Sequence, residues 1–347
     1  MRVLLDTTFA LRGHSGTGVY LAHLVPALER LGVEVLEARD EARSSPGGGR
    51  ARSARNLAAE LRWANAELPR RARALGADVL HHPLPVGTLA LGPPQVVTVH
   101  DLAFVHLPEA FDRGFRNYAL LAHRLATRRA GAVVAVSQAT ADDLRAQWNV
   151  PSARIVVARH GPGQEPETHR PRAERPRHFL YVGDDEPRKN LGLLLAGYAR
   201  YRVSAEEPLP LVLAGTAAPA PAEGVERVDR PDAERLAALY AEAAALVHPS
   251  LHEGFGLTPL EAMSAGTPVL AARSSGVEEV CGDAALYVEA YDAGGIATRL
   301  AELAVGGALR RDLSERGRRR AAEFSWTRSA RAHLDAYALA IGGGGRT

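Results

Sequence analysis

Short apolar runs alternate with stretches of helical periodicity along the whole chain. In the first half, strands are predicted at residues 3–6, 33–37, 78–81, 95–100 and 132–136, with helices at 19–31, 55–75 and 112–130. In the second half, strands are predicted at 179–182, 211–214, 246–248 and 269–272, with helices at 190–201, 232–244 and 259–265. Repeated alternation of this kind is typical of βαβ units. The pattern therefore predicts an α/β chain with two Rossmann-like, doubly wound parallel sheets.

The two halves are separated by a Pro- and Arg-rich stretch without periodicity, between His160 and Arg177, which is typical of a linker. A length of 347 residues also favours two domains over one. We predict an N-terminal domain over 1–165, a linker over 166–177, a C-terminal domain over 178–325 and a closing segment over 326–347. Helices near 292–305, 308–323 and 327–340 complete the prediction, and the glycines at 342–345 are expected to end the last one.

The composition is that of a folded chain, with 46% hydrophobic and 24% charged residues. The single cysteine, Cys281, excludes an internal disulfide framework, and no Cys or His cluster has the spacing of a zinc site. No stretch approaches the ~20 apolar residues of a membrane span, and the first apolar run is too short for a signal peptide. We therefore expect a cytoplasmic protein. An aromatic content of 5% offers no stacking platform, so nucleic acid is not an expected partner.

Basic residues cluster in the first half. Residues 43–73 contain eight Arg against Glu60 and Glu67, in a loop predicted at 40–54 and in the helix after it. This density suits anionic lipid, and so a peripheral contact at the inner face of a membrane, or another polyanion. A solvated helix face is the alternative that the Arg-rich composition favours. Of 42 basic residues only Lys189 is Lys, which is expected where a planar guanidinium cannot replace a compact ammonium.

Two glutamates stand eight residues apart in the run HPSLHEGFGLTPLEAMSAG, residues 248–266. Glu253 precedes a Gly-Phe-Gly turn, and Glu261 lies in the helix predicted after it. Ligands of open α/β sheets bind beyond the carboxyl ends of the strands, where a glycine-rich turn into a helix offers N–H groups to phosphate. Carboxylates in these places can accept hydrogen bonds from two sets of hydroxyls, one on a sugar and one on a ribose. Two unrelated surface glutamates are the alternative, which the neighbouring strand, glycines and Pro259 disfavour.

A second candidate site lies in FLYVGDDEPRKNL, residues 179–191. Arg188 and Lys189 follow a strand and precede a helix, where two cations and a helix N-terminus can neutralise a diphosphate. The acids at 184–186 could suggest a metal site, but adjacent acids in a loop more often face water or cap the next helix. No metal is expected.

His100 and Asp101 end an apolar strand in QVVTVHDLAF. They are candidates for an acid/base or sugar-contacting pair. The alternative is that Asp101 caps the next turn and that His100 is a satisfied buried imidazole.

The glycine-rich run GHSGTGVY, residues 13–20, precedes a predicted helix. It predicts a loop that faces a phosphate or an acceptor through Gly16, Thr17 and Gly18. Glu37 and Asp40 lie about 20 residues further on, as in dinucleotide-binding proteins. The glycine spacing differs from that fingerprint, however, and nothing downstream is typical of a hydride-transfer site.

Together these motifs resemble the retaining glycosyltransferase family 4, of the two-lobed GT-B fold, and especially its bacterial mannosyltransferase-like members. The similar segments are the glycine-rich loop at 13–18, His100-Asp101-Leu102, VSQAT at 136–140, EPRKNL at 186–191, EGFGLTPLEAM at 253–263, GTPVLA at 266–271 and GDAALYV at 282–288. The resemblance implies two Rossmann-like domains that face a cleft. The first would hold the acceptor and the second the sugar nucleotide, and the last helix would cross back to the first.

The resemblance also implies roles for the candidate residues. Glu253 would contact hydroxyls of the donor sugar, Glu261 the ribose, and Arg188 with Lys189 the diphosphate, while His100 would face the transferred sugar. The expected catalytic set is Lys189, Arg188, Glu253 and His100. The expected donor-binding set is Glu261, Gly254, Phe255, Gly256, Leu257, Thr258 and Gly183. The expected acceptor or phosphate set is Gly16, Thr17, Gly18 and Asp101. Many relatives carry Arg directly after the glycine that matches Gly183, whereas this chain carries Asp184, so Arg188 is expected to supply the second cation.

The implied activity is retaining, metal-independent and cofactor-free transfer of a sugar from a nucleotide-diphosphate sugar to a hydroxyl of a glycan, a lipid-linked or a small-molecule acceptor, as in polysaccharide biosynthesis. GDP-mannose is the first choice of donor, and UDP-hexose, dTDP-sugars or a deoxysugar nucleotide such as a rhamnose donor are the alternatives. The competing hypotheses are a GT-B-fold sugar-nucleotide epimerase, a catalytically silent sugar-nucleotide-binding subunit and, third, a nicotinamide oxidoreductase.

Overall fold

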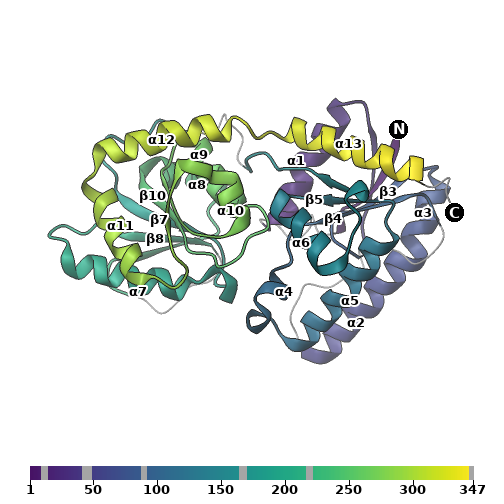
Figure 1. Cartoon of the computed structure of the whole chain (residues 1–347), viewed down its shortest axis with the longest axis horizontal. Helices are drawn as coiled ribbons and strands as arrows, with labels where there is room; N and C mark the ends of the chain where they lie inside the picture. The colour runs from purple at the N-terminus through teal and green to yellow at the C-terminus, as the bar shows by residue number, and fades with distance from the viewer. Residues whose placement is uncertain (9–14, 41–48, 87–91, 164–169, 216–221, 344–347) are drawn as a thin grey trace. The chain divides into compact units, whose positions relative to one another are not determined.

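The computed structural model describes residues 1–8, 15–40, 49–86, 92–163, 170–215 and 222–343, without the side chains of 49–54. The chain divides into two compact units (Figure 1). The first contains Met1–Val105, Asp112–His160 and Trp326–Thr347, and the second contains His106–Phe111 and Gly161–Ser325. The glycine at position 13 and residues 164–169, at the start of the predicted linker, lie outside the described residues.

The first unit is built on a parallel six-stranded sheet in the order β2-β1-β3-β4-β5-β6. Its strands are β1 (Arg2–Asp6), β2 (Glu34–Ala38), β3 (Val79–His82), β4 (Gln95–Val99), β5 (Ala132–Ala135) and β6 (Ile155–Val157). Its helices are α1 (Gly16–Arg30), α2 (Gly49–Arg62), α3 (Leu68–Ala74), α4 (Ala103–His106), α5 (Arg113–Arg129), α6 (Gln138–Trp148) and α13 (Trp326–Gly343), of which α4 runs to the unit boundary. The strand order reverses between β1 and β3.

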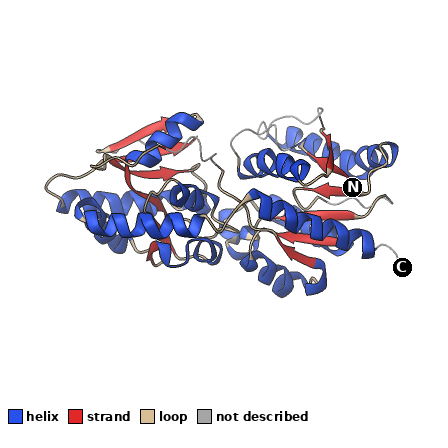
Figure 2. Ribbon diagram, turned by 90° about the horizontal axis from the view of Figure 1, so that it is seen from above, coloured by secondary structure: helices blue, strands red, loops and turns tan. Residues whose placement is uncertain are grey.

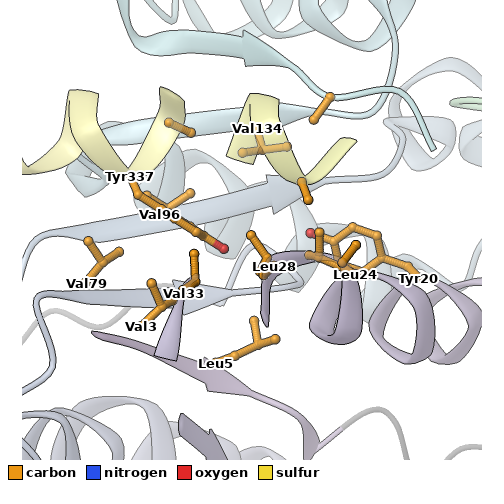
Figure 3. Close-up of a cluster of buried hydrophobic side chains, with 14 of the residues drawn as sticks. Val3, Leu5, Tyr20, Leu24, Leu28, Val33, Val79, Val96, Val134 and Tyr337 are labelled. Atoms are coloured by element: carbon orange, nitrogen blue, oxygen red, sulfur yellow. The ribbon is translucent and has the colours of Figure 1, made fainter. Parts of the chain in front are cut away.

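The core of this unit joins segments that are far apart in the sequence. Tyr20, Leu24 and Leu28 of α1 pack with strand residues such as Val96 and with Tyr337 of α13 (Figure 3). A side chain on Gly131, at the start of β5, would lie 2.9 Å from the backbone of Ala340. The last helix is therefore an integral layer of the first unit.

The second unit is built on a parallel six-stranded sheet in the order β12-β11-β10-β7-β8-β9. Its strands are β7 (His178–Val182), β8 (Leu211–Gly215), β9 (Val225–Asp229), β10 (Ala243–His248), β11 (Val269–Ala272) and β12 (Ala285–Val288). Its helices are α7 (Leu191–Ser204), α8 (Ala233–Glu242), α9 (Leu257–Ser264), α10 (Ser275–Cys281), α11 (Ala293–Val305) and α12 (Gly307–Ala321). Helices flank the strands in both units (Figure 2), as parallel sheets require because both of their faces must be buried.

The two doubly wound sheets predicted from the apolar pattern are confirmed, with several differences in detail. The predicted loop at 40–54 is wrong for residues 49–54, which form the start of α2, while 41–48 lie outside the described residues. Strand β9 was not predicted because it is an edge strand, VERVD, whose side chains are mostly exposed. Helix α13 continues through Gly342 to Gly343, so its predicted end near 340 is too early.

Candidate active site

The strand order of the second sheet reverses between β7 and β10, where the loops after both strands meet. In doubly wound sheets this is the point at which ligands bind, because the two connections leave for opposite faces. The N–H of Leu251, after β10, donates to the carbonyl of Arg188, after β7, at 2.8 Å. Backbone also approaches closely at Gly215, where a side chain would lie 1.9 Å from the carbonyl oxygen of Gly183. The first contact fixes the loops after β7 and β10 against each other, and the second brings the end of β8 against the residue after β7.

Lys189 and Arg188 converge on one carboxylate at this place. Lys189 Nζ lies 2.6 Å from Glu253 Oε1, and Arg188 Nη1 lies 3.2 Å from Glu253 Oε2. Arg188 Nε also pairs with Glu186 at 2.8 Å. The two cations stand on a short 3₁₀ turn, Pro187–Lys189, which ends at Asn190 with a left-handed φ of 53°. That turn points consecutive basic side chains toward the end of β10.

The ion cluster is largely withdrawn from solvent. The side chains of Lys189 and Glu253 are 15% and 12% exposed, and His248 Nε2 lies 3.4 Å from Glu253 Oε1. Burial alone would raise the pKa of Glu253, but the charge of Lys189, the nearby His248 ring and the charge of Arg188 hold that pKa well below its usual range. Burial lowers the pKa of His248. Glu253 is therefore an ionised carboxylate held by two cations.

The turn after Glu253 leads directly into α9. Gly256 takes a left-handed φ of 106° at the N-cap position, a conformation that favours glycine. Phe255 is buried against Phe324, with ring centroids 5.9 Å apart, and this contact anchors the turn. The N–H groups of Leu257 and Thr258 belong to the first helical turn and have no partner within the helix. They are available to an anion at the end of β10.

Glu261 lies one turn further along α9 and is buried. Its Oε2 accepts a hydrogen bond of 3.1 Å from the hydroxyl of Tyr240 on α8. Burial raises the pKa of Glu261 to about 7, and the Tyr240 hydrogen bond opposes that rise. Tyr240 is fixed in turn through its carbonyl, which accepts from Thr267 Oγ1 and Arg172 Nη1, both at 2.7 Å.

Three buried polar atoms follow the ends of β7, β10 and β11 without a hydrogen-bond partner among the described residues. They are Asn190 Nδ2, Ser250 Oγ and Ser274 Oγ. Buried polar groups in folded proteins are almost always paired, so an unpaired group at a strand end is typical of a site for a polar ligand. The sequence pattern did not identify these three residues, His248 or Tyr240 as candidates for the site. The one available signal was that Ser250 lies within the HPSLHE segment that contains Glu253.

In the first unit, Asp101 caps a helix, whereas His100 binds a backbone carbonyl. The carboxylate of Asp101 accepts from the N–H of Ala103 at 2.9 Å, so Asp101 caps α4, as one alternative from the sequence proposed. His100 Nε2 donates to the carbonyl of Pro83 at 2.9 Å, which leaves Nδ1 as its acceptor. Burial lowers the pKa of His100, although Asp101 and the Pro83 carbonyl act in the other direction. The ring is therefore a neutral, partly buried imidazole at the end of β4.

Gly16, Thr17 and Gly18 do not form the loop that was predicted, because they make the first turn of α1. Ser15 caps this helix, and its Oγ accepts from the N–H of Gly18 at 3.2 Å. Serine at an N-cap stabilises the helix start, which explains why the helix begins three residues before the predicted Val19. The structure thus brings Lys189, Arg188 and Glu253 together, with Glu261 further along α9, while His100, Asp101 and the glycines belong to the first unit.

Family models match nearly the whole chain. Residues 14–162 match the model described as Glycosyltransferase Family 4, and residues 165–320 match the model described as Glycosyl transferases group 1.

Curated relatives and solved structures agree with these models. O-antigen chain mannosyltransferase B of Escherichia coli is 29% identical over 267 residues, which cover 70% of each chain. O-antigen chain mannosyltransferase RfbU of Salmonella typhimurium is 28% identical over 214 residues, which cover 57% of each chain. A sucrose-phosphate synthase from Thermosynechococcus elongatus superposes with a TM-score of 0.79 at 20% identity, over 97% of this chain and 98% of that one, and so shows the GT-B fold. The chain belongs to the family 4 glycosyltransferases.

Proposed function

We propose that this glycosyltransferase moves a sugar, with mannose as the first choice, from a nucleotide-diphosphate sugar to a hydroxyl of a glycan or lipid-linked acceptor, with retention of anomeric configuration and without a metal or cofactor. The observation that carries the proposal is the pairing of Lys189 and Arg188 with the buried carboxylate of Glu253 at the reversal of the strand order. This arrangement supplies two cations and one acceptor group at the place where doubly wound sheets bind ligands.

A diphosphate would compete with Glu253 for the two cations. When Lys189 and Arg188 turn to the phosphate oxygens, the Glu253 carboxylate is released to accept hydrogen bonds from sugar hydroxyls. The first-turn N–H groups of α9 lie after the same loop and would contribute partial positive charge. The buried carboxylate of Glu261, oriented by Tyr240, fits the hydroxyls of a ribose. The diphosphate, the sugar and the ribose of a sugar nucleotide would thereby each have a partner in the second unit.

The proposed reaction occurs on one face of the sugar. The bond between the anomeric carbon and the β-phosphate oxygen breaks while the acceptor oxygen bonds to the same carbon from the same face. The acceptor proton passes to the departing phosphate, so no protein base is required. Lys189 and Arg188 stabilise the charge that develops on the leaving group, which is the kind of electrostatic contribution that lowers barriers most. His100 of the first unit is proposed to contact the transferred sugar.

The names of the relatives support mannose as the transferred sugar, and GDP-mannose as the donor to test first. A thermal-shift screen against GDP-, UDP-, dTDP- and ADP-sugars tests this choice, since a ligand that binds the native state raises the unfolding temperature by mass action. A shift with GDP-mannose alone supports mannose, whereas a stronger shift with another sugar nucleotide replaces it. No shift with any of them would overturn the proposed site.

Product analysis tests the reaction itself. Donor consumption should require an acceptor and should proceed at an equal rate in the presence of a chelator. The one-bond coupling constant between C1 and H1 of the product should show the anomeric configuration of the donor, because the H1–H2 coupling of mannose is small in both anomers. Consumption without an acceptor would instead identify an epimerase, and binding without consumption a silent subunit. An inverted anomer would overturn the mechanism.

A further inference from the structure

Helices α2 and α5 of the first unit expose an unusual share of apolar side chains. Eleven large hydrophobic side chains are exposed among the described residues, and five belong to these two helices. The five are Leu57 (39% exposed), Leu61 (49%), Phe115 (51%), Leu121 (61%) and Leu125 (37%). The helices lie side by side (Figure 1), and the hydroxyl of Tyr118 on α5 donates to Glu60 on α2 at 2.5 Å. We call these residues, with the arginines of the same helices, the α2–α5 surface.

The α2–α5 surface is also strongly basic. Helix α5, RGFRNYALLAHRLATRR, has five arginines and no acidic residue in its 17 positions. The acids of the neighbouring segment are already engaged: Glu60 is buried and accepts from Tyr118, and Glu67 pairs with Arg62 at 3.1 Å. Helix α5 itself therefore carries an excess of positive charge.

Apolar and basic residues share the outward face of α5. Leu121, Arg124, Leu125 and Arg128 follow the spacing i, i+3, i+4, i+7, which places them on one side of a helix, and all four are exposed. The opposite side carries the buried residues Ala119, Ala126 and Thr127. On α2, Leu57 and Leu61 are likewise one turn apart. A soluble helix normally turns such a leucine stripe toward the core.

We propose that the α2–α5 surface binds an anionic lipid bilayer, with Leu121, Leu125 and their neighbours in the acyl boundary and the arginines at the headgroups. This combination is typical of elements that lie in a membrane interface. A soluble polyanion would satisfy the arginines but would gain nothing from the leucines, which is why the bilayer is favoured. None of the described helices has the length and hydropathy of a bilayer span.

This surface differs from the basic region that the sequence suggested. Arg43 and the side chains of Arg50 and Arg52 lie outside the described residues. Leu57 and Leu61 do fall within 43–73, but the other exposed apolar side chains of the surface come from α5, which is far from that region in the sequence. The proposed membrane contact does not depend on the proposed donor site, so an experiment can disprove the membrane contact while the donor site stands.

The test is flotation of the full-length protein with vesicles of phosphatidylcholine alone or mixed with phosphatidylglycerol. We expect binding only to the mixed vesicles, and weaker binding as salt is raised. Two double variants separate the apolar from the electrostatic contribution to vesicle binding. Leu121→Ser with Leu125→Ser removes apolar side chains, and Arg124→Gln with Arg128→Gln removes positive charge. Each should reduce vesicle binding by at least about tenfold, since each removes two anchoring side chains.

Matched controls change exposed residues of the second unit. Val203→Ser with Val305→Ser removes two apolar side chains that are 91% and 86% exposed, and Arg311→Gln with Arg319→Gln removes two exposed charges from α12. These variants should bind vesicles like the unchanged protein, and circular dichroism should show that all four are folded. Absence of binding to the mixed vesicles would overturn the proposal. If the arginine variant loses vesicle binding while the leucine variant keeps it, and if the unchanged protein binds heparin as well as it binds the mixed vesicles, the surface would instead bind a soluble polyanion.

Discussion

Nζ of Lys189 lies 2.6 Å from Oε1 of Glu253, and this contact joins the loop after β7 to the loop after β10. The only lysine of the chain is thus held by a carboxylate side chain that is only 12% exposed. Breaking a buried pair by removing one partner leaves the other charge uncompensated. The pair is therefore expected to matter both for the loop conformation and for the charge that a ligand meets.

Lys189→Ala should reduce turnover far more than donor affinity. If the ammonium stabilises charge that develops on the leaving phosphate, its loss should lower kcat by about 100-fold or more, as for other groups that act in the transition state. The affinity for the sugar nucleotide, measured by calorimetry, should change by much less because Arg188 still contacts the diphosphate. Equal losses in kcat and affinity would remove the leaving-group role.

Two further variants control this experiment. Lys189→Arg keeps the charge in a planar, larger group and should restore only part of the activity. Arg227→Ala removes an exposed ion pair of the second unit, with Asp229 at 3.2 Å, and should leave kcat unchanged.

How far the sequence predicts this site depends on strand order. The apolar runs showed where the strands are, because parallel strands such as β10 are buried along their whole length. They did not show that β7 lies beside β10, which is what brings Lys189 to Glu253 across 64 residues. The contact between Tyr240 and Glu261 could not be predicted for the same reason, since the Tyr240 hydroxyl reaches Glu261 only through the packing of α8 against the sheet. Local patterns thus predict the elements and the candidate residues, while long-range packing decides the partners.

The affinity for the donor should depend on the protonation of Glu261. Its pKa is about 7, and a protonated carboxyl cannot accept hydrogen bonds from two hydroxyls as a carboxylate can. The affinity should therefore rise as the pH is raised through about 7. A nucleotide sugar is the right ligand for this titration, because its diphosphate is esterified at both ends and keeps a constant charge over the range.

Tyr240→Phe should move that transition to higher pH. The hydroxyl of Tyr240 stabilises the ionised form of Glu261, so its removal raises the pKa of the carboxyl further. Glu261→Gln should abolish the transition altogether and lower the affinity at alkaline pH. A purely structural role of Tyr240 predicts a loss of affinity with an unchanged midpoint, and that result would argue against the ribose contact.

The first unit should lose stability in acid through its buried histidines. His81 bonds Tyr337 and Thr98, both at 2.9 Å, and His333 Nε2 bonds the hydroxyl of Tyr20 at 2.7 Å. Burial lowers the pKa of His333 to about 4, against the hydrogen bond to the Ser329 carbonyl, and burial also lowers the pKa of His81. Because these pKa values lie below the value of about 6.5 in an unfolded chain, the unfolded state takes up more protons as the pH falls.

The free energy of unfolding should therefore be highest above about pH 6.5 and should fall as the pH approaches about 4. His333 alone accounts for about 2 kcal/mol between pH values of about 7.5 and about 5. Urea denaturation of His333→Gln, which cannot titrate, should show a smaller decrease over this interval even if the variant is less stable throughout. An unchanged decrease would mean that His333 does not remain neutral in the folded state.

A pair of glycine substitutions separates the role of the Glu253 loop from general effects on helices. A side chain on Gly276 of α10 would lie 2.2 Å from the carbonyl oxygen of Glu253, so Gly276→Ala must displace the loop that carries the carboxylate. We expect a loss of about 1–3 kcal/mol in stability, as for other overpacked sites, and a clear loss of donor affinity in calorimetry. Gly192 of α7 has nothing within 4 Å of that position, so Gly192→Ala should raise the stability by up to about 1 kcal/mol through helix propensity and leave the affinity unchanged. If Gly276→Ala bound the donor as well as Gly192→Ala does, the position of the Glu253 loop would not be critical for the donor, and the proposed contact between Glu253 and the sugar would have to be abandoned.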